Sequence, residues 1–239
     1  NMKNSMPELV RPEFSVKDAS LLLEEHYGLC CTLKEFPGER DRNFLAQEKN
    51  GETYVLKISN SCETLEFLQV QHAALERSSK LLEPGRIPIV FPAKNGESLL
   101  RVSSADGSQH WMRLVRYVDG LPMAEYRPHT GEFLRELGRM CGTVTKALHE
   151  IPAPPPSHTL LWEMHNVQET LHEYLPWIKD EKLLGWVKKS LDLYSRTIEA
   201  LESKLRRGWI HNDFNDYNVL AVPKISGNPD LGLIDFGDM

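Results

Sequence analysis

Several features that mark membrane, disulfide-rich or nucleic-acid-binding proteins are absent from this sequence. No hydrophobic run approaches the roughly 20 residues that span a bilayer, and no signal peptide precedes the polar start. The four cysteines form neither a CxxC pair nor a regular disulfide framework. The formal net charge of -6 argues against a general nucleic-acid-binding surface. We therefore expect a cytoplasmic protein with buried free thiols, which binds neither membranes nor nucleic acids.

The composition is that of a soluble globular protein, with 41% hydrophobic and 26% charged residues among 239. This length fits one large domain or two smaller lobes. The polar opening, residues 1–12, is expected to be a disordered end.

Residues 13–120 predict a mostly antiparallel sheet with helices packed on it. Ser15 and Asp18 can form a capping box for a first helix, and Gly28 can end that helix. Asn50-Gly51 stands between two runs that alternate apolar and polar residues, which is a strong hairpin signal. The stretch "CETLEFLQVQHAALERSSKLL" then carries apolar residues at helical spacing. Further strands follow, joined by Asn-Gly and Asp-Gly turns.

Residues 121–239 change character and predict a mainly helical region. "TGEFLRELGRMCGTVTKALHEI" reads as an amphipathic helix, and Pro152–Pro156 as an extended connector. The pattern from Trp162 to Arg207 is largely helical, and the chain then returns to short strands and tight loops. The expected fold class is therefore α+β, with an antiparallel-sheet N-lobe over residues 13–120 and a mainly helical C-lobe over residues 121–239.

Two polar loops near the end of the chain carry the clearest chemical signal. "HNDFNDYNVL" has the pattern H-x-D-x-x-x-x-N, which places Asp213 at a loop tip and Asn218 at the start of the next strand. Asp235 ends the strand-like run "LGLID", 17 residues after Asn218. Each loop alone could be a surface Asx-turn. Together, bordered by apolar strands, they favour a magnesium-nucleotide site, because Mg²⁺ selects oxygen ligands and phosphoryl transfer needs a carboxylate to orient the attacking hydroxyl.

Lys57, in "YVLKIS", is a candidate cation for the phosphates. It lies on the second predicted hairpin strand with apolar neighbours on both sides, so its ammonium needs an anionic partner. The alternative is a surface lysine whose stem lies along apolar groups while its head stays in water. Glu63 or Glu66, on the following helix, could hold Lys57 in position.

The motifs "IHNDFNDYNVL" and "LIDFGDM" together resemble the aminoglycoside phosphotransferase/choline kinase family, relatives of the protein kinases. More narrowly, "GERDRNF", "YVLKIS", "NDYNVL" and "DFGDM" are similar to hydroxylysine kinases and to the kinase-like domain of bacterial aminotransferase fusions. The resemblance implies a protein-kinase-like two-lobe fold. It also implies a small-molecule kinase that transfers the γ-phosphoryl group of ATP or GTP, with Mg²⁺, to a hydroxyl of an amino alcohol or a hydroxylated amino acid.

The resemblance also implies a role for each motif residue. Asp213 would be the catalytic base, Lys57 would hold the nucleotide phosphates, and Asn218 and Asp235 would bind Mg²⁺. His211 would support the catalytic loop, while Glu66 is expected as structural support only from its place on the helix after Lys57. Further nucleotide contacts would come from the loop over the phosphates and from the hinge between the lobes: Arg40, Asp41, Asn43, Arg116, Tyr117 and Val118. Without the family, residues 114–120 read equally well as an edge strand and a turn.

Three departures from the family pattern leave alternatives open. Asn212 stands where close relatives usually have Gly, and Gln69 occupies the place where the helix acid often stands. Family members continue with further helices after the DFG-like turn, so we expect a truncated C-lobe, as in a domain of a longer chain, one alternative being an aminotransferase fusion. One alternative function is a non-catalytic nucleotide-binding module of a larger protein. Another is a kinase for choline, ethanolamine, homoserine or an aminoglycoside.

Overall fold

The computed structural model describes residues 11–38, 40–153, 166–201, 204–222, 224 and 229–239. The chain divides into two compact units. The first contains residues 1–151 and 210–237 together with Met239, and the second contains residues 152–209 together with Asp238. The lobe boundary expected near residue 120 lies inside the first unit, and the division into two lobes at that residue stays a prediction.

The first unit is built on a six-stranded antiparallel sheet in which β1, β2, β3, β6 and β4 are neighbours in that order, and β5 pairs with β6. The strands are β1 (Cys31–Phe36), β2 (Arg42–Glu48), β3 (Thr53–Ile58), β4 (Val90–Phe91), β5 (Leu100–Ser103) and β6 (Gln109–Arg116). The predicted hairpin at Asn50-Gly51 joins β2 to β3. Gly51 has φ 93° and donates its N–H to the carbonyl of Glu48 at 3.0 Å, a backbone conformation that favours glycine.

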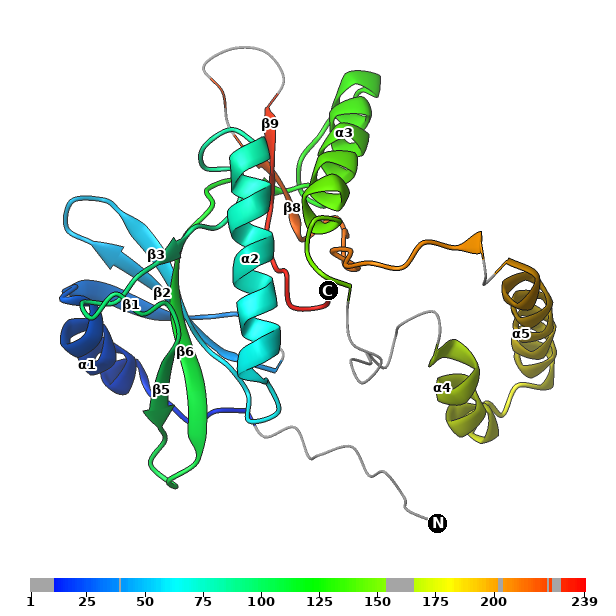
Figure 1. Ribbon diagram of the computed structural model, residues 1–239, viewed down its shortest axis with the longest axis horizontal. Coiled ribbons are helices and arrows are strands. Elements are labelled where there is room, and N and C mark those ends of the chain that lie inside the picture. Colours follow the sequence, from blue (N-terminus) through cyan, green and yellow to red (C-terminus); the bar gives the residue numbers. More distant parts are fainter. Residues whose placement is uncertain (1–10, 39, 154–165, 202–203, 223, 225–228) are drawn as a thin grey trace. The chain divides into compact units, whose positions relative to one another are not determined.

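Two helices lie on opposite faces of this sheet (Figure 1). Helix α1 (Val16–Tyr27) has the predicted capping box of Ser15 and Asp18 and ends at Gly28. Its buried side chains join the apolar core on one face of the sheet, which includes Phe44, Leu56 and Leu114. Helix α2 (Leu65–Leu81), capped by the Thr64 side chain, covers the other face.

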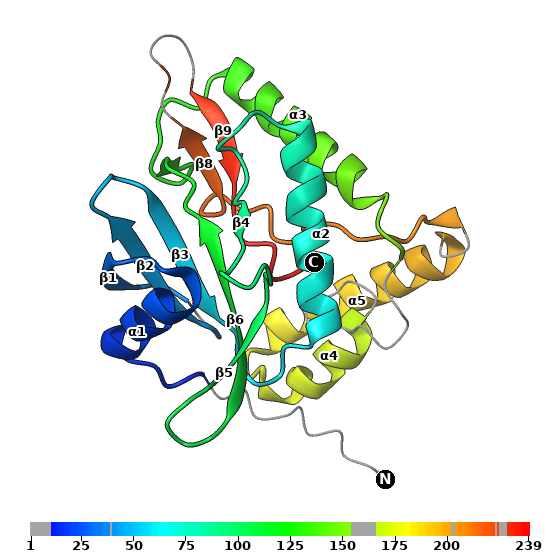
Figure 2. The ribbon, with the colours of Figure 1, turned by 60° about the vertical axis from the view of Figure 1, so that its left-hand side comes forward.

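The rest of the first unit is a helix and a small sheet. Helix α3 (Gly131–Leu148) is capped by the Thr130 side chain and packs against α2. Strands β7 (Leu121–Pro122), β8 (Val219–Val222) and β9 (Asp230–Leu233) form a three-stranded antiparallel sheet in that order. Figures 1 and 2 show β8 and β9 next to the end of β6, from which residues 117–120 lead to β7.

The second unit is helical, as the sequence predicts. Its described elements are α4 (Val167–Tyr174), the 3-10 turn η2 (Leu175–Trp177) and α5 (Glu181–Leu201). Asp180 caps α5, because its carboxylate accepts the N–H groups of Lys182 and Leu183 at 2.8 and 3.0 Å. Most of the predicted Pro152–Pro156 connector lies outside the described residues.

The prediction of buried thiols is wrong, although the cysteines are free. Cys30, Cys62 and Cys141 are exposed, and Cys31 is half-buried. Their positions explain this, since Cys30 and Cys31 lie at the start of the edge strand β1 and Cys62 lies in the turn before α2. Among the described residues, no helix is long and apolar enough to cross a bilayer.

Candidate active site

The β8–β9 hairpin brings the two polar loops together. Val219 at the start of β8 pairs with Leu233 at the end of β9, so the residues before β8 and after β9 emerge at the same end of the hairpin. The Ile234 N–H extends this ladder by donating to the carbonyl of Asn218 at 2.9 Å. A second backbone bond, from Leu233 N–H to the carbonyl of Arg86 at 2.8 Å, ties β9 to the segment that follows α2.

The Asp213 carboxylate is held on both oxygens by side-chain amides. Asn215 donates to Oδ1 at 2.8 Å, and Asn218 Nδ2 donates to Oδ2 at 2.7 Å and to the Asp213 carbonyl at 3.0 Å. Asn215 is itself fixed, because its Oδ1 accepts the N–H groups of Tyr217 and Asn218 at 2.8 and 3.0 Å. Asp213 is therefore oriented before any substrate binds. Because the Asn218 amide nitrogen is engaged here, its Oδ1 oxygen is left without a donor among the described residues.

His211 connects the two loops. Its side chain is 4% exposed, and its Nε2 lies 3.0 Å from the carbonyl oxygen of Ile234, the residue before Asp235. The imidazole also makes edge contacts with the rings of Phe214 and Phe236, at centroid distances of 5.5 and 4.7 Å. This placement suits a structural role, because it fixes the spacing between the Asp213 loop and the Asp235 turn.

Asp235 occupies a tight turn with a left-handed backbone, φ 62°. The Asp235 carboxylate forms a hydrogen bond with the backbone of Gly237, and a side chain at position 237 would lie 3.2 Å from Asp235 Oδ1. Lys57 lowers the pKa of the Asp235 carboxyl, against the effect of burial, with smaller contributions in the same direction from Arg113 and His211. The carboxylate is thus held ionised, as a metal ligand must be.

Lys57 and Asp235 form an ion pair, with Lys57 Nζ 3.6 Å from Asp235 Oδ1. Lys57 lies on the face of β3 opposite the apolar core, and the antiparallel register places Asn43 of β2 and Arg113 of β6 directly beside it. Its side chain is only 19% exposed, so the ammonium does not lie freely in water. Glu66, the expected support for Lys57, is exposed in the first turn of α2, and no described ion pair joins the two.

The segment expected over the phosphates, residues 38–44, is held in place by hydrogen bonds of its own side chains. Asn43 Nδ2 donates to the carbonyl of Pro37 at 2.9 Å, and a side chain at Gly38 would meet Asn43 Nδ2 at 2.4 Å. Asp41 Oδ1 accepts two hydrogen bonds from Asn60, at 3.0 and 2.9 Å. Asp41 therefore fixes the loop to the end of β3, and its expected contact with the nucleotide stays a prediction. Of the two arginines in this segment, Arg42 pairs with Glu35 at 2.8 Å and Arg40 is half-buried.

Residues 116–118 connect the two sheets. Tyr117 N–H donates to the carbonyl of Thr53 at 3.0 Å, and the Tyr117 ring makes an edge contact with Phe36 of β1. Val118 is 3% exposed, and within the described part of the chain no backbone hydrogen bond involves it. Arg116 pairs instead with Glu52, away from Lys57. The purine contacts expected of residues 116–118 stay a prediction, and Val118 is the one of the three with no described backbone hydrogen bond.

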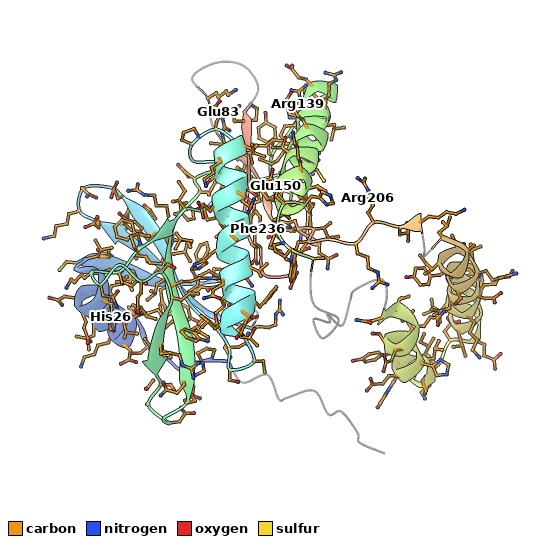
Figure 3. The ribbon with its side chains drawn as sticks, in the orientation of Figure 1. His26, Glu83, Arg139, Glu150, Arg206 and Phe236 are labelled. Atoms are coloured by element: carbon orange, nitrogen blue, oxygen red, sulfur yellow. The ribbon has the colours of Figure 1, made fainter. Side chains whose placement is uncertain are left out.

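A cavity of about 560 Å³ lies away from these residues, between α2, α3 and β9. Two ion pairs line it, Arg86 with Asp230 and Arg139 with Glu136. Figure 3 shows two of its lining residues, Glu83 just after α2 and Arg139 on α3. None of the predicted site residues lines this cavity, so it has no part in the chemistry of the candidate active site.

Two polar side chains near the site were not singled out from the sequence. Asn215 orients Asp213, and the only sequence signal was an additional Asn within "HNDFNDYN". Arg113 is 5% exposed and adjacent to Lys57, and its signal was a charged residue inside the apolar run "WMRLV". The role of each residue depends on a neighbour that the fold supplies, Asp213 for Asn215 and Lys57 for Arg113.

Comparison with known proteins places this geometry in a family. The model of the family described as "Phosphotransferase enzyme family" matches residues 32–239. Hydroxylysine kinase from Danio rerio is 24% identical over 247 residues, which cover 96% of this chain and 66% of that protein. The chain therefore spans about two thirds of the length of that relative.

Solved structures show the same fold at low identity. A microcompartment-associated aminopropanol kinase superposes with a TM-score of 0.67 at 20% identity, covering 94% of this chain and 70% of that one. An amicoumacin kinase, solved with AMP-PNP and Ca²⁺, superposes with a TM-score of 0.66 at 13% identity, covering 94% and 64%. The expected α+β, protein-kinase-like fold is thus confirmed. Because the family model covers most of the sequence, the chain belongs to the phosphotransferase enzyme family.

Proposed function

We propose that this chain forms the nucleotide-binding and catalytic part of a small-molecule kinase. The reaction would transfer the γ-phosphoryl group of ATP or GTP, in the presence of Mg²⁺, to a hydroxyl of an amino alcohol or a hydroxylated amino acid. The observation that carries the proposal is the Asp213 carboxylate, held by Asn215 and Asn218 beside the Lys57–Asp235 pair. A module that only bound a nucleotide would have no chemical use for an oriented carboxylate at that place.

The oxygen donors at this site fit Mg²⁺. Asp235 supplies a carboxylate and Asn218 an amide oxygen, and Mg²⁺ commonly takes one or two carboxylates and completes its shell with phosphates and water. Among the described residues, no group of three His, Cys, Asp or Glu side chains could hold a metal by itself. Asp235 and Asn218 would therefore hold the metal together with the nucleotide. Bound there, Mg²⁺ would neutralise charge on the β- and γ-phosphates.

Each side chain then has a defined part in the transfer. The acceptor hydroxyl oxygen forms a bond to the γ-phosphorus while the bond from that phosphorus to the β–γ bridging oxygen breaks, and the nucleoside diphosphate keeps the bridging oxygen. Asp213 orients the hydroxyl and accepts its proton. Lys57 stabilises the negative charge on the phosphates. The backbone of Val118 would meet the purine, and Arg40 would lie over the phosphates.

The acceptor class rests on the relatives. Hydroxylysine kinase and aminopropanol kinase are each named for an amine that also carries a hydroxyl group. A cationic amine would also suit a protein with a net charge of -6. We therefore propose 5-hydroxylysine and 1-amino-2-propanol as the first acceptors to test, ahead of choline, homoserine and an aminoglycoside.

Replacing Asp213 by Asn tests the catalytic assignment. Transfer from γ-labelled ATP to the best acceptor should fall by about 10²–10⁴-fold, because a positioned base contributes this much. The Kd of Mg·ATP, measured by titration calorimetry, should change by less than about threefold, since the substitution removes the base and leaves the phosphate contacts in place.

Asp216→Asn is the matched control. Asp216 is an exposed carboxylate in the same loop, so this variant makes the same charge change three residues away and should keep full activity. If nucleotide affinity collapses together with the rate in Asp213→Asn, Asp213 is misassigned. Equal losses in both variants would also contradict the proposed role.

A further inference from the structure

Arg113 is a buried cation that the proposed chemistry does not use. It lies in the middle of β6, 5% exposed, directly across the strand pair from Lys57. Like charges opposite each other in an antiparallel pair destabilise a sheet, and a buried guanidinium requires partners for its charge and its N–H groups. Burying this charge without partners costs free energy, so the groups around the guanidinium must offset that cost.

The one described hydrogen bond of Arg113 ties it to helix α2. Its Nη2 donates to Oε1 of Gln71 at 2.6 Å, and Gln71 is 2% exposed. An amide offers no opposite charge. The Nε and Nη1 groups of Arg113 are buried and have no hydrogen-bond partner among the described residues. The guanidinium is therefore anchored through Nη2, while the N–H groups of Nε and Nη1 can still donate hydrogen bonds.

The cation opposite Arg113 in the strand register, Lys57, pairs with Asp235, and carboxylates from three different segments act electrostatically on the guanidinium without forming a described ion pair with it. Burial lowers the pKa of Arg113, and Asp41, Glu63 and Asp235 oppose that shift. They come from the loop before β2, the segment before α2 and the turn after β9, respectively. His72 of α2 also feels the charge of Arg113. Arg113 of the sheet is thus bonded to α2 through Gln71 and acts electrostatically on Asp235 in the turn after β9.

We propose that Arg113 is a positioning residue for Asp235: its guanidinium, anchored to α2 through Gln71, keeps that carboxylate in place when Lys57 turns to the phosphates. The inference rests on the proposed function, in which the Lys57–Asp235 pair must open to admit the nucleotide. Once it opens, Asp235 loses its described ion-pair partner, and Arg113, the cross-strand neighbour of Lys57, remains as the second cation that acts on it. The side chains at Glu66 and Gln69 cannot couple α2 to this site, because both are exposed.

The test compares nucleotide binding with and without metal. The measured quantity is the ratio of the ATP Kd in EDTA to the ATP Kd in Mg²⁺, because this ratio isolates the metal ligands from the other nucleotide contacts. Arg113→Met should lower the ratio by about tenfold, since side chains that orient metal ligands contribute 10–100-fold to metal affinity. Metal-free ATP binding should change little, and Arg113→Lys, which keeps a cation, should restore most of the ratio.

A variant at the anchor keeps the test valid if Arg113→Met does not fold. Gln71→Glu has the same shape and gives the guanidinium a carboxylate that draws it away from Asp235, so the ratio should again fall while the folded protein keeps its thermal stability. Gln69→Glu makes the same charge change on the exposed face of α2 and should leave the ratio unchanged.

The outcomes separate this inference from the function on which it rests. If ATP binding to the unaltered chain does not depend on Mg²⁺, the proposed function fails, and the role of Arg113 fails with it. If that binding depends on Mg²⁺ but the ratio is unchanged in Arg113→Met and Gln71→Glu, only the role of Arg113 is overturned. A lower melting temperature with an unchanged ratio would show that Arg113 acts on stability alone.

Discussion

At the scale of single residues, the candidate site depends on two backbone positions that L-amino acids rarely adopt. Asn212 has φ 61° and Asp235 has φ 62°. Left-handed conformations cost most side chains roughly 1–2 kcal/mol, and Asn and Asp are the best tolerated after Gly. Asn at position 212, where the resemblance leads us to expect Gly, is compatible with this backbone. Asn keeps the loop geometry that a glycine would give, so His211 and Asp213 are still positioned on either side of it.

Substitutions at Asn212 should therefore follow backbone preference. Asn212→Gly should leave the free energy of unfolding within about 0.5 kcal/mol, whereas Asn212→Ala should lower it by about 1 kcal/mol. The side chain is exposed, so lost packing does not confuse the comparison. Urea denaturation of the two variants measures the difference. Equal stability of the Ala and Gly variants would contradict a left-handed requirement at this position.

Residue roles were less predictable than residue positions. The motifs placed Asp213, Asn218 and Asp235 from spacing alone, because loop tips and strand ends are local features. The partner of Lys57 was not predictable. The sequence offered Glu63 and Glu66 on the following helix, yet the ion pair is with Asp235, 178 positions further along the chain. That contact depends on how the hairpin of β8 and β9 meets the large sheet, which no local pattern encodes.

At the scale of elements, helix α2 presents a polar underside to the sheet. Leu68 and Leu75 are buried, as in an ordinary amphipathic helix, but so are Gln71 and the ring nitrogen Nε2 of His72, which has no described partner. Burial, followed by the charge of Arg113, lowers the pKa of His72 to about 4. The packing of the helix therefore favours the neutral imidazole.

This gives a prediction for stability against pH. The pKa of His72 in the folded protein lies below that of a free histidine, so the unfolded state binds more protons between about pH 6.5 and pH 4. The stabilisation is complete above pH 6.5 and is lost as the pH falls towards 4, by at most about 3 kcal/mol. In urea titrations over this range, His72→Leu should flatten the loss, with His172→Leu on α4 as the exposed control. A slope identical to that of the unaltered protein would contradict a buried neutral His72.

Most elements could be predicted, because their signals are local. Ser15 and Asp18 start α1, Gly28 ends it, and Asn50-Gly51 turns the chain between β2 and β3. Burial of the cysteines could not be predicted from their type, since exposure depends on where an edge strand or loop falls. The second unit also has a local signal, since it begins at Pro152 in the proline-rich connector and its described helices lie within the largely helical pattern from Trp162 to Arg207.

At the scale of the whole molecule, the first unit alone contains every residue of the candidate site. The six-stranded sheet supplies Lys57. Asn218 and Asp235 flank the hairpin of β8 and β9, and Asp213 lies in the loop before β8. This arrangement makes nucleotide binding testable on the chain itself. Acceptor recognition is a separate matter, since the chain spans about two thirds of the hydroxylysine kinase to which it is similar.

The most direct test of the central claim is thermal unfolding of the chain with ATP or GTP, with and without Mg²⁺, beside Asp235→Asn. A nucleotide at about 100 times its Kd should stabilise the unaltered chain by roughly 2.7 kcal/mol. For a protein of this size that is a rise of about 5–10 °C in the melting temperature. We predict a rise that requires Mg²⁺ and that Asp235→Asn largely loses. No rise with either nucleotide, or an equal rise in Asp235→Asn, would contradict a magnesium-nucleotide site built from these residues.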